Sequence, residues 1–282
     1  MRRKGIAMKK WYAVLGDPIA QSMSPTMHDQ WFGQSNLNAT YVPIHVEPQN
    51  LEQAIQSLRT LGCSGWNVTV PHKQAILPFL DEVDDSAKLM DAVNTVYQTN
   101  DGKLIGTNTD GAGFVRSLEE FAGDDGVDAP VLIIGAGGAA RGIAFALQSA
   151  GYGPLYFANR TASKAAELAA QMRNAYVFSI EEAEQRLGKF GLVVQTTSVG
   201  MNFAQEGMPL NPKNIARDAI VVDIIYNPLE TEFLQAAEQA GARIMNGVGM
   251  FVHQGALAFE KWTGVYPDTK KMIETITMKV GG

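Results

Sequence analysis

Cysteine, long apolar runs and positive charge are all scarce in this sequence. Cys63 is the single cysteine among 282 residues, which excludes an internal disulfide and is consistent with a reducing cytoplasm. No run reaches the roughly 18 apolar residues that a membrane helix requires. The formal net charge of −6 offers no basic field for nucleic acid or an anionic membrane. We interpret the one basic cluster, residues 2–4, as a leader or cloning remnant before a second start at Met8. We therefore expect a cytoplasmic protein whose partner is a small-molecule substrate, and we leave a homodimer open.

Metal binding is not indicated either. Cys63 follows Gly62 at the end of an expected helix and has no obvious histidine partner, which indicates a buried, unreactive thiol. The four histidines lack a ligand spacing such as H-E-x-x-H, so we expect no metal site and interpret all of them as structural or surface residues: His28, His45, His72 and His253.

What the sequence does contain is an ordinary globular composition in an alternating pattern. Hydrophobic residues make up 46% and charged residues 18%, and a length of 282 residues suits two domains better than one. Apolar strand-like runs alternate with helical patterns, which favours an α/β sheet. The first elements are expected at 11–16, 24–36, 40–46, 50–62 and 65–71, with Ser24 as a helix N-cap before Pro25 and a hairpin turn at Asn100-Asp101-Gly102.

A glycine-rich turn opens the second half of the chain. It follows the polar stretch 122–130, our candidate domain boundary, and joins four apolar residues, Val131 to Ile134, to an alanine-rich helix. The sequence of the turn, Gly135-Ala136-Gly137-Gly138-Ala139-Ala140, matches the G-x-G-x-x-A dinucleotide fingerprint. Glycines there allow a tight turn and close approach of a pyrophosphate to the helix N-terminus. The alternative is a plain glycine turn.

The residues after the next expected strand indicate which dinucleotide binds. An NAD enzyme carries Asp or Glu about 20 residues after the motif, where it binds the ribose 2′-hydroxyl. This sequence has Asn159, Arg160 and Thr161 there. With no carboxylate to repel it and a guanidinium to pair with it, a 2′-phosphate is favoured, which predicts NADP. The alternative is that Arg160 and Lys164 only begin a solvated helix.

Two later strand-like runs, 192–201 and 220–228, also end in polar residues. The carboxyl ends of strands face the ligand crevice in an open α/β sheet. Residues at those ends are therefore candidates to line the crevice, although capping of the next element explains them equally well: Thr196, Thr197, Ser198 and Tyr226.

A lysine stands directly after the third expected strand. Val68 and Val70 alternate with polar residues, which predicts one core face and one polar face, and Pro71 ends the strand pairing. Lys73 therefore emerges at a strand end beside Thr69. The alternative is an ordinary solvated loop lysine.

Other strand ends contribute amides and a carboxylate. "AVNT" provides Asn94, and "GTNTDG" provides Asn108 and Asp110. Together with Lys73, these groups would form a cleft suited to a polyhydroxylated molecule, with Lys73 and Asp110 as a proton-transfer pair. Burial would lower the pKa of the lysine and the carboxylate would raise it, and the sequence leaves that balance open.

Motifs in a specific order extend from Gly16 to Gly264. They are "SMSP", "NVTVPHK", "AVNT", "GTNTDG", "GAGGAA", "NRT", "TTSVGM", "DIIYNP" and "NGVGMFVHQGALAFEKWTG". In this order and spacing the chain resembles the shikimate dehydrogenases, NADP-dependent enzymes of aromatic amino-acid (chorismate) biosynthesis. The resemblance implies an N-terminal α/β substrate domain, 8–113, completed by C-terminal helices, 250–282. It also implies a Rossmann-type doubly wound parallel-sheet NADP domain, 114–249, with a cleft between the two.

The resemblance further implies reversible reduction of 3-dehydroshikimate to shikimate, with Lys73 and Asp110 as the catalytic pair. Ser22 and Ser24 would hold the substrate carboxylate. The other implied substrate-binding positions are Thr69, Asn94, Tyr226 and Gln254. The positions that match the family's NADP contacts are Gly135, Ala136, Gly137, Gly138, Ala139, Asn159, Arg160, Thr161, Lys164, Ile224 and Gly247.

Two alternatives to this function remain open. One is a dehydrogenase that uses quinate and NAD, which the paired serines and Thr69 disfavour without excluding. The other is a non-catalytic NADP-binding regulator. Retention of both Lys73 and Asp110 speaks against the regulator, because a sensor needs no proton donor.

Overall fold

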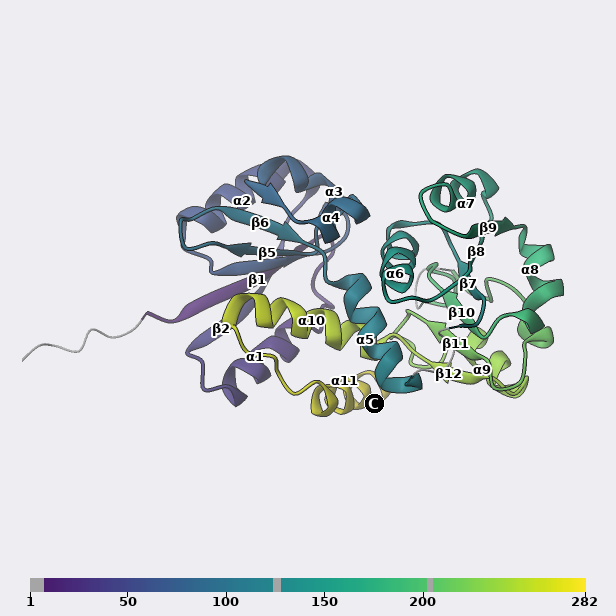
Figure 1. Ribbon diagram of the computed structural model, residues 1–282. Helices are drawn as coiled ribbons and strands as arrows, with labels where there is room; N and C mark the ends of the chain where they lie inside the picture. Colours follow the sequence, from purple (N-terminus) through teal and green to yellow (C-terminus); the bar gives the residue numbers. More distant parts are fainter. Residues whose placement is uncertain (1–7, 124–127, 202–204) are drawn as a thin grey trace, which may run out of the picture. The chain divides into compact units, whose positions relative to one another are not determined.

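Two units, each built on its own sheet, make up the chain (Figure 1). The structure is a computed structural model that describes residues 8–123, 128–201 and 205–282. Unit 1 contains the chain up to Thr109 together with Gly255–Asp268, and unit 2 contains Asp110–Gln254 together with Thr269–Gly282. The basic cluster at 2–4 and the middle of the polar stretch 122–130 lie outside the described residues.

Unit 1 is built on a mixed six-stranded sheet in the order β2-β1-β3-β5-β6-β4. β1 is parallel to β2 and β3, whereas β5 runs antiparallel to β3 and β6, and β4 is parallel to β6. The strands are β1 (Lys10–Gly16), β2 (Ala39–His45), β3 (Gly65–Val68), β4 (Glu82–Val83), β5 (Thr95–Gln98) and β6 (Leu104–Thr107). The helices are α1 (Ser24–Gln34), α2 (Leu51–Thr60), α3 (His72–Ala75), α4 (Asp85–Met90), the 3-10 turns η1 (Pro48–Asn50) and η2 (Leu77–Phe79), and α10 (Val248–Thr263) from Gly255 onward.

Alternation along β1 separates the two faces of this sheet. Ala13 and Leu15 pack into one core cluster with α2. Tyr12 lies next to Ala13 in the strand and therefore points to the opposite face. There its ring stacks on Phe32 of α1 at 5.1 Å and on Trp262 of α10 at 5.0 Å. The alternating elements and the hairpin expected from the sequence are confirmed in this unit.

Two local predictions for unit 1 are wrong. Helix α1 already includes Ser24, so Met23 occupies the N-cap position, and no described side chain caps the helix. Val70 is 68% exposed rather than in the core. The reason is that β3 ends at Val68, so the alternation of side chains along the strand no longer applies two residues later.

Unit 2 is built on a six-stranded sheet in the order β12-β11-β10-β7-β8-β9, and each neighbouring pair of its strands is parallel. Numbered from β7, this order is the 3-2-1-4-5-6 arrangement of the Rossmann fold, which confirms the predicted fold class. The strands are β7 (Val131–Ile134), β8 (Leu155–Ala158), β9 (Ala175–Phe178), β10 (Leu192–Gln195), β11 (Ile220–Asp223) and β12 (Arg243–Met245). The helices are α5 (Asp110–Ala122), α6 (Gly138–Ser149), α7 (Ala162–Ala169), α8 (Ile180–Arg186), η3 (Leu187–Lys189), η4 (Pro212–Asn214), α9 (Glu232–Gln239), α11 (Thr269–Gly281) and the start of α10.

Helices cover both faces of the unit 2 sheet. Val131 and Ile133 of β7 pack with residues of α5, α6 and α7, whereas Leu132 and Ile134 pack with residues of α8 and α9 (Figure 1). Because both faces are covered, every position of β7, β10 and β11 is buried, and these strands read as nearly continuous apolar runs. None of the described helices is long and apolar enough to cross a membrane.

The division between the units differs in place from the sequence-based domain limits. It falls between Thr109 and Asp110, whereas the residues gave the polar stretch 122–130 as the candidate boundary and the family resemblance implied a limit after residue 113. The first turn of α5 packs tightly on α6, since a Cβ on Gly111 would lie 2.6 Å from the Gly142 carbonyl oxygen. The C-terminal segment 250–282 is shared by both units, because α11 groups with unit 2.

Candidate functional site

The glycine-rich turn lies at the carboxyl end of β7, beside the ends of β8 and β10. Gly135 has a φ of +116°, which favours glycine, and a Cβ there would collide with the Thr196 hydroxyl. The Gly135 N–H donates to the Ala158 carbonyl at 2.8 Å, and Thr196 Oγ1 donates to the Ile134 carbonyl at 2.7 Å. The turn is therefore tied to both neighbouring strands at the point where the strand order reverses, the usual ligand position in this fold.

Helix α6 begins at the exposed end of this turn. Gly137 is the N-cap residue, and no described side chain occupies the first N–H groups of the helix. A Cβ on Gly137 or Gly138 would meet no atom of the described residues within 4 Å. An open helix start without side chains fits a pyrophosphate held by backbone N–H groups.

Residues 159–164 follow β8 at the same edge of the sheet. Asn159 Nδ2 donates to the Thr161 carbonyl at 2.9 Å, which shapes the turn into α7. Arg160, Thr161 and Lys164 are exposed, and this segment contains no carboxylate. Two exposed cations without a carboxylate fit a 2′-phosphate better than a 2′-hydroxyl.

A buried hydrogen-bond network in unit 1 contains one of the predicted substrate residues, Asn94. The Tyr41 hydroxyl donates to Asn67 Oδ1 at 2.6 Å, and Asn67 Nδ2 donates to Thr95 Oγ1 at 2.9 Å and to the Asn94 carbonyl at 3.1 Å. Asn94 Oδ1 accepts from the Thr95 hydroxyl at 2.8 Å and from the Thr109 N–H at 3.0 Å. All five residues are at most 8% exposed. Burial raises the pKa of Tyr41, so its hydroxyl keeps the proton that it donates.

Both predicted serines lie at the start of α1. The Ser24 N–H donates to Ser22 Oγ at 3.3 Å, and Ser24 is buried. The Ser24 side chain is also within hydrogen-bonding reach of the Tyr41 hydroxyl. The serine pair is thereby connected to the buried network of unit 1.

Thr69 and Lys73 join the same region through their main chains. The Thr69 N–H donates to the Leu15 carbonyl at 2.9 Å, and the Lys73 carbonyl accepts from the Val93 N–H at 2.7 Å. Val93 precedes Asn94 in the chain. Ser22, Ser24, Thr69, Lys73 and Asn94 all belong to unit 1, and Lys73 is half-buried there rather than fully solvated.

Unit 2 contains the second predicted catalytic residue, Asp110, and the other two predicted substrate-binding residues, Tyr226 and Gln254. Asp110 is the first residue of α5, where a carboxylate interacts favourably with the helix dipole. One turn later, a Cβ on Gly113 would lie 2.6 Å from the Gln254 backbone nitrogen. Gln254 Nε2 donates to the Phe251 carbonyl at 2.7 Å, and the Tyr226 ring stacks on the Phe251 ring at 5.0 Å. Lys73 and Asp110 thus belong to different units, and the chain passes from one unit to the other at the peptide bond before Asp110.

The remaining predicted cofactor positions, Ile224 and Gly247, are in direct backbone contact. A Cβ on Gly247 would collide with the Ile224 carbonyl group. The Gly247 N–H donates to the Ile225 carbonyl at 2.9 Å. This close approach explains why glycine occupies the position before α10.

The shikimate dehydrogenase family models match most of the chain. The "Shikimate dehydrogenase substrate binding domain" matches residues 14–96, "Shikimate / quinate 5-dehydrogenase" matches 119–236, and "Shikimate 5'-dehydrogenase C-terminal domain" matches 247–277. A shikimate dehydrogenase (NADP(+)) of Lysinibacillus sphaericus is 54% identical over 275 residues, which cover 98% of this chain and 100% of that protein. The chain belongs to the shikimate dehydrogenase family.

Solved structures of this family share the fold. Shikimate 5-dehydrogenase of Thermus thermophilus, crystallised with NADP(H) and shikimate, has a TM-score of 0.86 and 36% identity, covering 95% of this chain and 99% of that one. Quinate dehydrogenase of Corynebacterium glutamicum, in complex with NAD, has a TM-score of 0.89 and 32% identity, covering 96% and 99%.

Several side chains considered from the sequence take structural roles in this shikimate dehydrogenase family member. Asn108 is buried, and its Nδ2 donates to the Ala92 carbonyl at 2.9 Å. Cys63 is buried, as predicted, and burial is the main cause that raises its pKa to about 11. His72 Nε2 donates to the Val46 carbonyl at 2.6 Å. No group of described His, Cys, Asp or Glu residues has the arrangement of a metal site.

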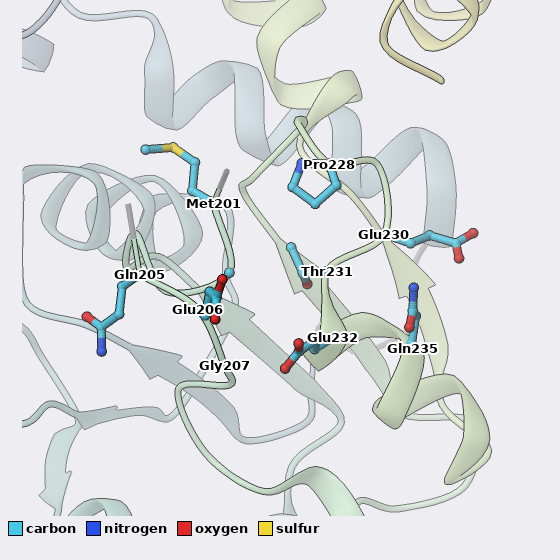
Figure 2. A pocket seen from close by; sticks show the side chains of 10 residues that line it. Met201, Gln205, Glu206, Gly207, Pro228, Glu230, Thr231, Glu232 and Gln235 are labelled. Atoms are coloured by element: carbon cyan, nitrogen blue, oxygen red, sulfur yellow. The ribbon is translucent and has the colours of Figure 1, made fainter. Parts of the chain in front are cut away.

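A separate cavity of about 570 Å³ lies in unit 2, between the segment around Gly200 and the start of α9 (Figure 2). Glu206, Glu230 and Glu232 line it, and its described lining includes no Lys or Arg. The negative charge disfavours the phosphates of a dinucleotide. This cavity contains none of the predicted site residues.

Two buried polar residues were not predicted, although the sequence contains a signal for each. Asn67 was assigned only to a polar strand face, although an amide inside the third strand signals a buried hydrogen-bond network. Asp223 was passed over, although a carboxylate ends an otherwise apolar run, "IVVD". Tyr41 and Thr95 carry no comparable signal, because their partners are distant in sequence.

Proposed function

We propose that this protein is an NADP-dependent shikimate dehydrogenase, which catalyses the reversible reduction of 3-dehydroshikimate to shikimate in aromatic amino-acid biosynthesis. The observation that carries the proposal is the 54% identity, over the full length, to a relative named shikimate dehydrogenase (NADP(+)). A more distant relative of the same fold is named as binding both NADP(H) and shikimate. The reaction is thus an oxidation and reduction at one CH–OH group.

The substrate is bound by neutral donors and acceptors. Ser22 and Ser24 hold its carboxylate through hydroxyl groups at the start of α1. Thr69 and Asn94 meet its ring hydroxyls from unit 1, and Tyr226 and Gln254 do so from unit 2. Support for this assignment is the buried network around Asn94, which fixes polar side chains before substrate arrives and so reduces the entropy lost on binding.

Lys73 and Asp110 are the proposed catalytic pair. In the direction of oxidation they take the proton of the reacting hydroxyl, and in the direction of reduction they return it to the same oxygen. NADP supplies the hydride acceptor or donor when it is bound.

The cofactor is held by the turn at Gly135 to Ala139 and by the segment after β8. Backbone N–H groups at the start of α6 bind the pyrophosphate. Asn159, Arg160, Thr161 and Lys164 bind the 2′-phosphate side of the adenosine, and Ile224 and Gly247 complete the site. The two exposed cations in a segment without a carboxylate support NADP over NAD.

The test is an absorbance assay at the reduced-nicotinamide band, with shikimate and quinate each supplied with NADP and with NAD. The expected result is the highest kcat/KM for shikimate with NADP. A higher kcat/KM for quinate with NAD would instead support the quinate-using alternative. That alternative is tested because a quinate dehydrogenase is 32% identical to this chain.

A regulator that binds NADP without catalysis is the remaining alternative. It predicts no turnover in any of the four combinations, together with intact binding of NADPH measured by its fluorescence. The presence of both Lys73 and Asp110 favours the enzyme, since binding alone requires neither.

The proposal includes the cytoplasm as the compartment and small molecules as the ligands. The buried single thiol and the net charge of −6 support it. The sequence leaves a homodimer open, and light scattering of the purified protein decides between monomer and dimer by the molar mass in solution.

A further inference from the structure

We propose that Asp223 is a positioning residue for Tyr226. The inference rests on the proposed function, in which Tyr226 contacts the substrate and Asp223 has no role. Asp223 is the last residue of β11 and is 0% exposed. A buried carboxylate lowers stability unless hydrogen bonds compensate for its lost hydration, so its partners show which segment it stabilises.

Both oxygens of Asp223 bind the turn that follows it. Oδ1 accepts from the Ile225 N–H at 3.0 Å, and Oδ2 accepts from Thr231 Oγ1 at 2.8 Å. Thr231 is the N-cap residue of α9, and its Oγ1 accepts from the Leu234 N–H at 3.3 Å. One side chain thereby ties the end of β11 to both ends of the turn 224–231.

Further backbone contacts hold the turn just before Tyr226. The Ile224 N–H donates to the Gln195 carbonyl at 3.2 Å, and the Ile225 carbonyl accepts from the Gly247 N–H at 2.9 Å. Ile225 is therefore bound at its N–H by Asp223 and at its carbonyl by Gly247. With both polar groups of the preceding residue fixed, the direction in which the chain enters Tyr226 is fixed as well.

The Tyr226 ring packs on α10, the helix that begins at the residue after Gly247. It stacks on Phe251 of α10 at 5.0 Å with 29° between the ring planes. The Phe251 N–H donates to the Gly247 carbonyl at 2.9 Å, so the stacking partner and the backbone clamp are one helical turn apart. Burial raises the pKa of Tyr226, which keeps its hydroxyl available as a donor. The hydroxyl is thus presented in one orientation.

The neighbouring strand has a comparable arrangement at the equivalent position. Gln195 pairs with Asp223 in the sheet register and is also fully buried. Its Oε1 accepts from the Thr197 N–H at 2.7 Å, and its Nε2 donates to the Val199 carbonyl at 3.0 Å. Adjacent strand ends therefore each use a buried side chain to shape the next turn. Asp223 faces two donors, and each of its two oxygens accepts one of them.

The test uses variants at the two ends of the hydrogen bond between Asp223 and Thr231. Asp223→Asn retains an acceptor for the Ile225 N–H and replaces the acceptor facing Thr231 by an NH₂ group. Thr231→Val removes the same bond from the other side, together with the cap of the Leu234 N–H, and Thr231→Ser is the matched control that keeps the hydroxyl for both. We expect kcat/KM for shikimate to fall about tenfold in the first two variants and to stay within about twofold of wild type in Thr231→Ser.

A double-mutant cycle with Tyr226→Phe separates positioning from general stability. If Asp223 acts through the Tyr226 hydroxyl, Asp223→Asn changes kcat/KM by less than about twofold once that hydroxyl is absent. Additive effects overturn the proposal, as does wild-type kcat/KM in Asp223→Asn or in Tyr226→Phe. If Asp223→Asn does not fold by circular dichroism, Thr231→Val takes its place in the cycle. A wild type without shikimate turnover overturns the proposed function as well, whereas an active wild type with an additive cycle overturns this inference alone.

Discussion

Buried polar side chains face one another across neighbouring strands in the unit 1 sheet, whereas in the unit 2 sheet they bind the turns that follow their own strands. Asn67, Thr95 and Thr107 belong to β3, β5 and β6, are buried, and occupy paired positions in the sheet register, Asn67 with Thr95 and Thr95 with Thr107. In unit 2 the corresponding residues, Gln195 and Asp223, are the last of β10 and β11. The two sheets therefore contribute differently to a binding site: one presents polar groups from its strands, and the other shapes the turns that follow its strands.

The topology of the two sheets accounts for this difference. The unit 2 sheet is parallel and covered by helices on both faces, so a polar side chain within a central strand would lie in an apolar layer. The unit 1 sheet is mixed, and its short strands β3, β5 and β6 place amides and hydroxyls within reach of one another. The polar groups of unit 1 thus satisfy each other's hydrogen bonds.

The two units also differ in the spectroscopic signal that each one provides. All four tryptophans of the chain belong to unit 1: Trp11, Trp31, Trp66 and Trp262. Tryptophan fluorescence therefore follows unit 1, while the reduced-nicotinamide signal follows the cofactor segments of unit 2. These two signals allow the comparison to be tested unit by unit.

The largest expected effect is on turnover, from Lys73→Ala. We expect kcat to fall about 10²- to 10⁴-fold, roughly 3 to 5.5 kcal/mol of barrier, because the proton donor is lost. NADPH affinity should be unchanged, because the proposed cofactor residues lie in unit 2. Lys88→Ala, which removes an exposed lysine of α4, is the control for charge. Near-normal kcat in Lys73→Ala would exclude Lys73 from the mechanism.

The next effect concerns acid stability of unit 1, through His28. This side chain is buried among aromatic rings, stacked on Tyr41 at 4.4 Å, and neither ring nitrogen has a partner among the described residues. Burial lowers its pKa to about 3. The unfolded chain protonates this histidine near pH 6.5 and the folded chain does not, so the free energy of unfolding falls as pH drops from about 6.5 to 3, by about 3 to 5 kcal/mol.

His28→Phe should remove that loss. The measurement is urea unfolding followed by tryptophan fluorescence at several pH values. His45→Gln is the matched control, because His45 is an exposed histidine of the same unit. An unchanged pH dependence in His28→Phe would show that His28 is not the group responsible.

The opposite pH dependence is expected in unit 2, from Asp223. Burial is the largest cause that raises its pKa to about 6, above the usual value of 3.8. The folded chain holds this proton more tightly than the unfolded chain, so its contribution is complete below pH 3.8 and is lost as pH rises to about 6, by about 2 to 3 kcal/mol.

Asp223→Asn should therefore abolish this decrease between about pH 4 and 6. Urea unfolding followed by far-ultraviolet circular dichroism measures it. Glu238→Gln, an exposed carboxylate of α9, is the control. If the free energy of unfolding changes equally with pH in wild type and in Asp223→Asn, the carboxylate does not titrate in that range. The opposite pH dependence of the two units would then be absent.

The smallest expected effect is on cofactor choice, from Arg160→Ala. KM for NADPH should rise about tenfold, because a charge-assisted hydrogen bond to the 2′-phosphate is lost, and KM for NADH should stay within about twofold. Lys213→Ala, an exposed cation elsewhere in unit 2, is the control. Equal increases for both cofactors would argue against a 2′-phosphate contact and would assign the residue a general role.

Residues that are neighbours in sequence were sufficient to predict the helices and strands, the glycine-rich turn and the polar segment 159–164. The alternation of apolar residues in a strand and the spacing of glycines in a turn each involve only a few adjacent residues. Gly135 is an example, because its φ of +116° is a requirement of the backbone at that position. The prediction that Val70 lies in the core was wrong because β3 ends at Val68, and the turn that follows determines where the strand ends.

Only the folded chain revealed that Tyr41, Asn67, Thr95 and Asn94 form one network, or that Asp223 and Gly247 hold opposite groups of Ile225. Most of these contacts join segments that lie apart along the chain, and a hydrogen bond depends on distance and angle rather than on residue type. Residue chemistry specifies which bonds a side chain is able to make. Packing selects the partner, because only the folded backbone brings a particular donor to a particular acceptor and removes the water that would otherwise take its place.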